Sequence, residues 1–263
     1  MESLKVIGGG LVLPRERLEI IKEIVKQDKK LYVSKLSEKF DVTEETIRRD
    51  LEKLEKEGLV TRTYGGAILN TDGKNEDKKF IKREIENEEL KNIIASKALN
   101  YVTSGVTLAA DSSTTVTEIL SLIKDREDIT VITNSVEGLI ELSDSDVNVL
   151  STGGILKRNL KSLQGSIAKS TILNYNVDIA FLSCKAIDMK KGIMDSNEAE
   201  SELKKLMKKQ ADKTILLIDH TKFNKSSFIK VFDFKDIDMV ITDEKPNEEW
   251  IEYLKKNKVD LIF

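Results

Sequence analysis

Residues 33–58 have the pattern of a helix, a short turn and a second helix. This pattern restricts the possible fold more than any other stretch of the sequence. Val33, Leu36 and Phe40 recur at helical spacing before the run is broken. Thr43 then stands where its hydroxyl can cap the start of a second helix. The stretch therefore predicts a helix-turn-helix.

The second helix has a clear inward face and a clear outward face. Its apolar residues follow the i, i+4, i+7 spacing of a buried stripe from Ile47 to Leu54. At about 100° per residue, Arg49 points almost directly away from that stripe, with Arg48 and Thr46 on the flanks. A face of this kind is suited to a major groove, where an arginine can donate two hydrogen bonds to guanine.

A hairpin is expected after Gly58, which stands where a helix C-terminal cap belongs. Leu59–Arg62 and Ala67–Leu69 flank Thr63–Gly66, where we expect the glycines to supply positive φ. Leu31-Tyr32 is expected to add a short strand beside this hairpin. The pattern predicts a wing.

Pro14 begins a further helix expected to pack behind the helix-turn-helix, so we place a winged helix-turn-helix at residues 14–69. The alternative is a small helical or protein-docking domain. Acidic residues, Asp50 among them, nearly balance the basic ones on the second helix, and the net charge is -3. Any DNA contact must therefore be local. The expected DNA-binding residues are Thr43, Glu44, Thr46, Arg48, Arg49, Arg62, Tyr64, Gly65 and Gly66.

A second domain is expected to follow a linker. Residues 70–79 are polar and contain glycine, which is typical of a linker. We expect a helix from Phe80 to Val102 and an α/β domain over residues 80–263. Beyond Gly105, short β-rich runs alternate with helical segments, which predicts a mostly parallel sheet covered by helices.

Polar residues follow the predicted strands at their C-terminal ends, the edge where ligands bind in open α/β sheets. Hydroxyls and free N–H groups at a helix N-terminus favour a phosphate or carboxylate, so we predict an anionic small molecule as the ligand. The alternative is that the hydroxyls only cap helices and the lysines are solvated. The expected effector-binding residues are Asp111, Ser112, Ser113, Thr114, Thr115, Thr133, Asn134, Ser135, Gly153, Gly154, Lys157, Arg158, Lys185, Asp188, Glu198 and Lys222.

Composition argues against several other classes of protein. A single cysteine, Cys184, cannot form an internal disulfide, and we expect it to be a small buried hydrophobe. One histidine and one cysteine make a zinc site improbable, and no cofactor is expected. The first 13 residues are too short to span a bilayer, and neither a signal peptide nor a membrane-length apolar run is present. We expect a cytoplasmic protein without membrane contact.

The sequence resembles the DeoR family of bacterial transcription regulators, mostly repressors of sugar metabolism. Residues 43–51, TEETIRRDL, carry the resemblance in the first domain together with Leu54, Gly58 and Tyr64–Ala67. The family's wing has histidine where Tyr64 stands. In the second domain the matching segments are Asp111–Thr115, Thr133–Ser135, Gly153-Gly154, Leu163, Gly165, Phe181–Ser183, Ala186–Asp188, Glu198 and Asp219–Phe223.

The resemblance implies a sensor domain similar in fold to ribose-5-phosphate isomerase, with a sugar-phosphate effector site. Three glycines of the family pattern are replaced here, by Ser113, Ser183 and Ala186, which leaves the identity of the effector open.

Two functions follow as hypotheses. In the first, the protein is a repressor, a homo-dimer or homo-tetramer whose affinity for double-stranded operator DNA is controlled by a phosphorylated sugar. In the second, it is a sugar-phosphate isomerase with a DNA-binding or docking head, in which Asp188 or Glu198 is the base and Lys222 the electrophile. We favour the first and expect no enzymatic activity, because kinship of fold does not establish activity.

Overall fold

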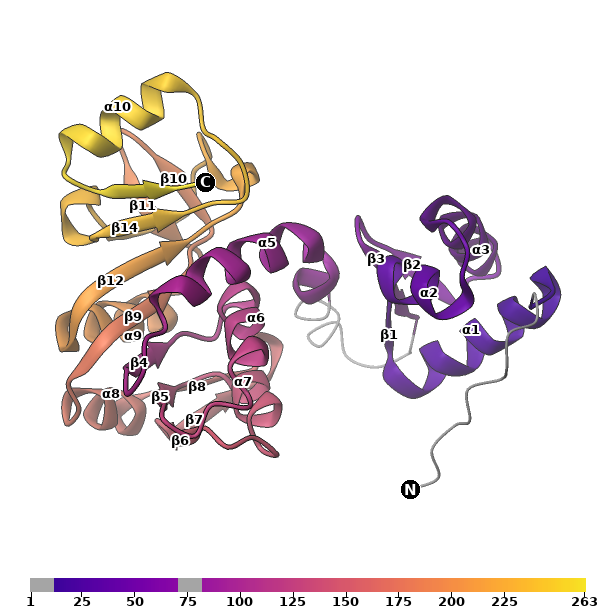
Figure 1. Cartoon of the computed structure of the whole chain (residues 1–263), viewed down its shortest axis with the longest axis horizontal. Helices are drawn as coiled ribbons and strands as arrows, with labels where there is room; N and C mark the ends of the chain where they lie inside the picture. Colours follow the sequence, from indigo (N-terminus) through magenta and orange to yellow (C-terminus); the bar gives the residue numbers. More distant parts are fainter. Residues whose placement is uncertain (1–11, 71–81) are drawn as a thin grey trace. The chain divides into compact units, whose positions relative to one another are not determined.

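The computed structural model describes residues 12–70 and 82–263, and the chain forms two compact units that divide between Glu88 and Glu89 (Figure 1). Each unit has its own hydrophobic core. None of the helices in the described part of the chain combines the length and apolarity that a membrane crossing requires.

The first unit is a winged helix-turn-helix, as the sequence predicted. Its three strands form an antiparallel sheet in the order β1-β3-β2. The expected strand at Leu31-Tyr32 is confirmed as part of β1. In chain order the elements are α1 (Pro14–Asp28), β1 (Lys30–Tyr32), α2 (Val33–Phe40), α3 (Glu44–Lys56), β2 (Val60–Arg62) and β3 (Gly66–Leu69).

The ends of these helices form for the expected local reasons. Pro14 occupies the first helical position of α1, where its missing N–H costs nothing. The Thr43 hydroxyl caps α3 by accepting a hydrogen bond from the backbone N–H of Thr46 at 3.3 Å. Gly58 follows the end of α3 with φ of +74°.

A buried ion pair joins the first and third helices. Arg17 Nε donates to Asp50 Oδ2 at 2.7 Å, and Asp50 is only 2% exposed. Asp50 therefore belongs to the interior and does not contribute to the charge of the exposed face of α3. A helical wheel cannot identify such a residue, because its partner lies 33 positions away.

The wing glycines serve close packing rather than an unusual φ. Neither Gly65 nor Gly66 has a positive φ, so that expectation was wrong. A Cβ at Gly65 would lie 2.6 Å from the carbonyl oxygen of Ile85, and one at Gly66 would overlap the carbonyl oxygen of Leu31. The sheet and the segment beside it can approach only because these residues have no side chain.

The single helix expected from Phe80 to Val102 is interrupted. Residues 82–85 are helical, Asn87 takes a left-handed conformation with φ of 60°, and helix α5 (Glu88–Ala98) follows, with the 3₁₀ turn η1 (Leu99–Tyr101) at its end. Asparagine tolerates that φ better than most residues, and periodicity alone cannot reveal the break. Phe80 lies outside the described residues, as does the expected linker 70–79 apart from Asn70.

The second unit is built on one parallel sheet of seven strands in the order β15-β14-β12-β9-β4-β5-β6. Every neighbouring pair is parallel, which confirms the predicted α/β class. The strands are β4 (Thr107–Ala110), β5 (Thr130–Thr133), β6 (Asn148–Ser151), β9 (Val177–Leu182), β12 (Ala211–Leu217), β14 (Met239–Ile241) and β15 (Asp260–Ile262). The helices are α6 (Thr114–Leu122), α7 (Val136–Glu141), α8 (Ser166–Leu173), α9 (Glu198–Gln210) and α10 (Glu248–Lys256).

Smaller antiparallel elements that periodicity did not reveal surround this sheet. Strands β7 (Ile155–Lys157) and β8 (Ser162–Gln164) form a hairpin, with the 3₁₀ turn η2 (Arg158–Leu160) between them. A three-stranded sheet contains β10 (Ala186–Asp188), β11 (Gly192–Asp195) and β13 (Ile229–Phe232). The other short turns are η3 (His220–Lys222) and η4 (Phe234–Asp236).

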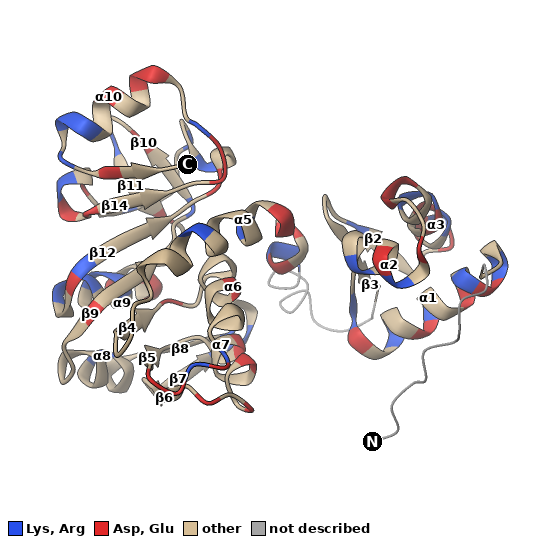
Figure 2. Ribbon diagram, in the orientation of Figure 1, with Lys and Arg blue, Asp and Glu red and all other residues tan. Residues whose placement is uncertain are grey.

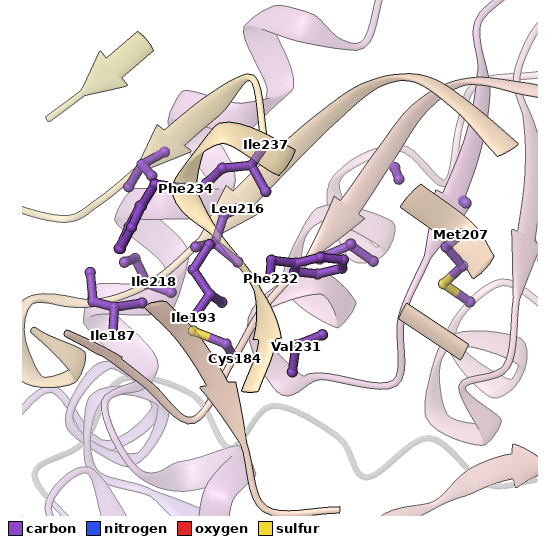
Figure 3. Packing of buried hydrophobic residues seen from close by; sticks show 14 of the residues in the cluster. Cys184, Ile187, Ile193, Met207, Leu216, Ile218, Val231, Phe232, Phe234 and Ile237 are labelled. Atoms are coloured by element: carbon purple, nitrogen blue, oxygen red, sulfur yellow. The ribbon is translucent and has the colours of Figure 1, made fainter. Parts of the chain in front are cut away.

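Alternate residues of each central strand enter the cores on opposite faces of the large sheet. In β9, Ala180 and Leu182 join one cluster and Phe181 joins the other. Figure 3 shows Cys184 within the first cluster, close to Ile193. Burial raises the pKa of the Cys184 thiol to about 12, which suits an unreactive core residue.

We predict that Gly66→Ala opens the wing. The new methyl group must displace the β1 backbone, and overpacking of this kind costs about 1–3 kcal/mol. Amide hydrogen exchange in the β1–β3 ladder should accelerate accordingly. The matched variant is Gly58→Ala, whose Cβ would meet no atom within 4 Å and whose strain falls at the end of α3. Equal exchange of the ladder in both variants would contradict the packing role.

Candidate functional site

The outer face of α3 presents its polar side chains as the sequence predicted. The Arg49 side chain is 73% exposed and that of Arg48 is 48% exposed. At the start of the helix, the hydroxyls of Thr43 and Thr46 are hydrogen-bonded to each other at 2.9 Å. The structure thus brings Thr43, Glu44, Thr46, Arg48 and Arg49 together on one accessible surface.

Both arginines of this face already contact an acid one turn earlier. Arg48 pairs with Glu44, and Arg49 Nε lies 3.2 Å from Glu45 Oε1. Figure 2 shows acidic and basic residues interleaved on α3. Exposed pairs of this spacing are worth only about 0.3–0.5 kcal/mol, so a DNA phosphate or base edge can replace the carboxylate at small cost.

The wing is fastened to the same helix by a carboxylate. Glu55 accepts hydrogen bonds from the backbone N–H of Arg62 at 3.0 Å and from its Nε at 2.8 Å. The backbone bond, followed by the side-chain bond, lowers the pKa of Glu55. Tyr64 is 79% exposed at the turn of the wing, whereas Gly65 and Gly66 are packing residues.

The second candidate site lies at the C-terminal edge of the large sheet. Because all its strands are parallel, the segments that follow β6, β5, β4, β9 and β12 come to one edge in that spatial order. We call these segments the strand-end loops. They contain Asp111–Thr115, Thr133–Ser135, Thr152–Gly154, Ser183–Lys185 and Asp219–Lys222.

The carboxylate of Asp111 ties two of the strand-end loops together. Its Oδ1 accepts from the backbone N–H of Ser113 and its Oδ2 from that of Ser183, both at 2.9 Å. Ser113 in turn caps α6 by accepting from the N–H of Val116 at 3.4 Å. Asp111 therefore orients both the helix N-terminus and the loop that follows β9.

A buried lysine contacts the same carboxylate, and sequence reasoning missed it. Lys204 Nζ lies 2.7 Å from the Ser183 carbonyl oxygen, 2.5 Å from Asp195 Oδ2 and 3.4 Å from Asp111 Oδ2. Glu200, one turn earlier on α9, accepts from the Ser112 hydroxyl at 2.6 Å. We call Asp111, Asp195, Glu200 and Lys204 the charge cluster. All four are at most 7% exposed.

Two members of the charge cluster, Lys204 and Glu200, have shifted pKa values. Burial lowers the pKa of Lys204, but the carboxylates of Asp111, Asp195 and Glu200 raise it by more, so the net direction is upward and the lysine stays charged. Burial raises the pKa of Glu200 in spite of Lys204 and Ser112. The available signal in the sequence was a glutamate and a lysine spaced i, i+4 on the same helix face as the apolar Leu203 and Met207.

The loop after β5 uses its polar groups mainly within the protein. The Thr133 hydroxyl donates to the Ala110 carbonyl at 2.7 Å, and Ser135 caps α7 through the N–H of Gly138 at 3.0 Å. Asn134 Nδ2 donates to the Ser162 hydroxyl at 2.9 Å. The Asn134 Oδ1, although buried, has no hydrogen-bond partner among the described residues, and a ligand donor can stabilise such an atom.

The paired glycines permit a close backbone approach. Gly154 has φ of 110°, and a Cβ there would overlap the carbonyl oxygen of Gln164.

Thr114 and Thr115 are buried in the first turn of α6. Lys157 and Arg158, on the hairpin that follows the glycines, are exposed, and within the described part of the chain no ion pair involves either.

The four remaining charged residues of the predicted effector site do not lie together. Lys222 Nζ, in η3, is 3.5 Å from Asp219 Oδ2 and joins the strand-end loops. The Asp188 carboxylate accepts from the backbone N–H groups of Lys190 and Lys191 in the β10–β11 turn, and these bonds lower its pKa. Glu198 is exposed in the first turn of α9, so the buried glutamate beside the loops is Glu200. The Lys185 side chain is also exposed.

The three residues that replace glycines adopt ordinary backbone conformations. Ser113 has φ of -80°, and neither Ser183 nor Ala186 has a positive φ. Ser113 also gains a capping hydroxyl that a glycine lacks. The substitutions are therefore accommodated without backbone strain.

His220 lies beside the same edge and pairs with an acid. Its Nδ1 is 2.6 Å from Asp243 Oδ2, and its backbone N–H donates to the same carboxylate at 2.7 Å. The Asp243 carboxylate raises the pKa of His220, because it accepts a hydrogen bond from the protonated ring. Among the described residues, these two and Glu244 form the one group with metal-ligand atoms within 4.8 Å of one another.

Comparison with known proteins gives consistent matches along the chain. The model of the DeoR-like helix-turn-helix domain matches residues 17–72, and that of the DeoR C terminal sensor domain matches residues 86–244. The uncharacterized HTH-type transcriptional regulator YulB of Bacillus subtilis is 41% identical over 94% of this chain and 96% of its own length. A putative aga operon transcriptional repressor of Escherichia coli O157:H7 is 34% identical, over 94% of this chain and 93% of its own.

Among solved structures, a D-ribose-5-phosphate isomerase in complex with phospho-erythronic acid is similar to this chain. The two are 17% identical with a TM-score of 0.39, and the match covers 52% of this chain and 54% of the other.

We predict that the imidazole of His220, which is the one histidine of the sequence, titrates above its usual pKa of about 6.5. Asp243→Asn should lower that pKa, as measured by the NMR signal of the ring. Because the folded pKa is raised, the stabilisation is fully present below about pH 6.5 and is lost as the pH rises through the folded value. An unchanged pKa in Asp243→Asn would disprove the pairing.

Proposed function

The chain belongs to the DeoR family of transcriptional regulators, and from that premise we propose that it binds operator DNA under the control of a phosphorylated sugar. The first unit would hold the DNA, and the strand-end loops of the second would hold the effector. The single observation that best supports this proposal is the capped α3 helix with exposed Arg48 and Arg49 on its outer face.

The geometry of the first unit supports a division of labour on DNA. Arg49 lies on the exposed face of α3 and suits a guanine edge in the major groove. The N-terminus of α3 with Thr43, and the wing with Arg62 and Tyr64, suit phosphate oxygens. Because acidic residues offset the basic residues of α3, attraction between opposite charges would supply little of the affinity for DNA. Contacts with the bases would therefore contribute a larger share of it.

The effector half of the proposal is supported by the strand-end loops. The N-terminus of α6, with Thr114 and Thr115 in its first turn, suits a phosphate. Asn134, Gly153 and Gly154 suit close contact with the sugar part, and Lys157, Arg158 and Lys222 suit its charge. These assignments carry over from the family resemblance and from position at the sheet edge.

We further propose that the protein is a repressor that acts as a homo-dimer or homo-tetramer. One helix reads only a few base pairs, so paired heads on neighbouring half-sites are needed for a specific operator. An effector coupling of about 1–3 kcal/mol would change the operator affinity roughly 5- to 150-fold.

The chain is a regulator and not an isomerase, since the family to which it belongs consists of DNA-binding transcriptional regulators. The positions of the proposed bases agree with this: Asp188 caps a turn and Glu198 is exposed.

The proposal is tested by binding of the protein to the DNA upstream of its own gene, with and without a panel of phosphorylated sugars. The salt concentration must be fixed, because phosphate contacts make the affinity steeply salt-dependent. We expect specific binding that one sugar phosphate weakens. A sugar phosphate that strengthens binding would make the effector a co-repressor instead of an inducer, and the absence of specific binding in every condition would refute the DNA-binding role.

We predict that Arg49→Ala costs about 1–3 kcal/mol in operator binding and relaxes the preference for one base pair. Affinity should be measured for the operator and for single-base variants of it. Lys56→Ala is the matched control, since Lys56 is equally exposed, pairs with Glu52 one turn earlier, and lies in the last turn of α3. Uniform weakening on all sequences would instead assign Arg49 to a phosphate.

Lys222→Met should leave operator affinity unchanged and abolish the response to the sugar phosphate. Lys222 has a side chain that is 27% exposed and lies at the sheet edge, far along the chain from α3. Lys225→Met, in the same exposed segment, is the control and should respond normally. If both variants respond normally, Lys222 does not contact the effector.

A further inference from the structure

We infer that Lys204 is a positioning residue that holds the strand-end loops after β4 and β9 in the arrangement that binds an anion. Nothing in the sequence motifs assigns a role to it. The inference rests on the proposed effector site at this edge. It adds a buried residue that holds the loops of that site in place.

Lys204 contacts three segments of the chain at once. Its ammonium contacts the Ser183 carbonyl in one loop, Asp111 in the other loop and Asp195 at the end of β11. Asp111, held by Lys204, in turn fixes both loops, because its two oxygens accept hydrogen bonds from the backbone N–H groups of Ser113 and Ser183. The first turn of α6 is thus oriented by a carboxylate whose counter-ion is Lys204.

The charge balance of the cluster makes the lysine hard to replace. Asp111, Asp195 and Glu200 surround one ammonium, and all four groups are nearly inaccessible to water. A buried carboxylate without a cation is costly, and loss of the ammonium would make the cluster more negative and so oppose an incoming anion at the nearby helix N-terminus. Lys204 therefore serves both the geometry of the loops and their electrostatic potential.

The test compares two proteins that differ only at residue 204. Lys204→Met alone leaves uncompensated carboxylates and is at risk of failing to fold. We therefore use Asp195→Asn as the background and add Lys204→Met to it, which restores the formal charge of the wild-type cluster. In Asp195→Asn alone, we expect Lys204 to keep the contacts that it makes here with Asp111 and Ser183.

The first measurement is amide hydrogen exchange in the full chain. We expect the Ser113 and Ser183 amides to exchange roughly tenfold faster in the double variant than in Asp195→Asn, which corresponds to about 1.4 kcal/mol of lost protection. Leu203→Ala is the control, since Leu203 is a buried apolar neighbour on α9 that packs in the first core cluster. It should lower overall stability without selectively exposing these amides. Equal exchange at both amides in the two proteins would overturn the inference.

The second measurement is binding of inorganic phosphate. We expect Asp195→Asn to bind phosphate and the double variant to bind it at least roughly tenfold more weakly. Faster exchange with unchanged phosphate affinity would mean that Lys204 orders loops that do not hold the anion, and would overturn the link to the effector. If the wild-type protein binds neither phosphate nor any sugar phosphate, the proposed effector site fails, while the exchange comparison still decides whether Lys204 orders the loops.

Discussion

Parallel pairing of the seven-stranded sheet is the constraint on which the second unit depends. Strands β4, β5, β6, β9 and β12 all run in one direction, so the loop that follows each strand begins at the same edge of the sheet. Segments separated by more than a hundred residues, such as Asp111 and Asp219, thereby become neighbours of one edge. At this edge the side chains of Asp111, Ser113 and Ser135 accept hydrogen bonds from backbone N–H groups that the strands and helices leave open.

The same edge combines two demands that oppose each other. Helix N-termini and lysines favour an anion, yet three of the four groups in the charge cluster beneath them are carboxyls. Lys204 relieves the conflict by contacting two of those carboxyls, and burial raises the pKa of the third, Glu200. A related balance occurs on α3, where Glu44 and Glu45 pair with the two exposed arginines. In both units, therefore, charge is arranged locally rather than as a broad field, in keeping with a net charge of only -3.

Much of the architecture could be predicted from local pattern. Local pattern predicts the Thr43 cap, the apolar stripe on α3 and the β2–β3 hairpin of the wing, because each of these features depends on residues that are close together in the sequence. The errors share a different cause. The burial of Asp50 could not be predicted, because its partner Arg17 lies far from it in the sequence. Gly66 is required because a side chain there would overlap the carbonyl oxygen of Leu31, and not because of its own φ.

Periodicity and capping are short-range properties, so the sequence was enough to predict the two classes of unit, the faces of α3 and the gathering of hydroxyl, amide and glycine residues at strand ends. Which of these polar residues are buried, and what they contact, depends on the tertiary packing. It brought Lys204 from α9 to Asp111 and left Glu198 exposed two residues before the buried Glu200. The physical reason is that a buried charge is stable only beside its counter-charge, and the identity of that partner is fixed by the packing of distant segments.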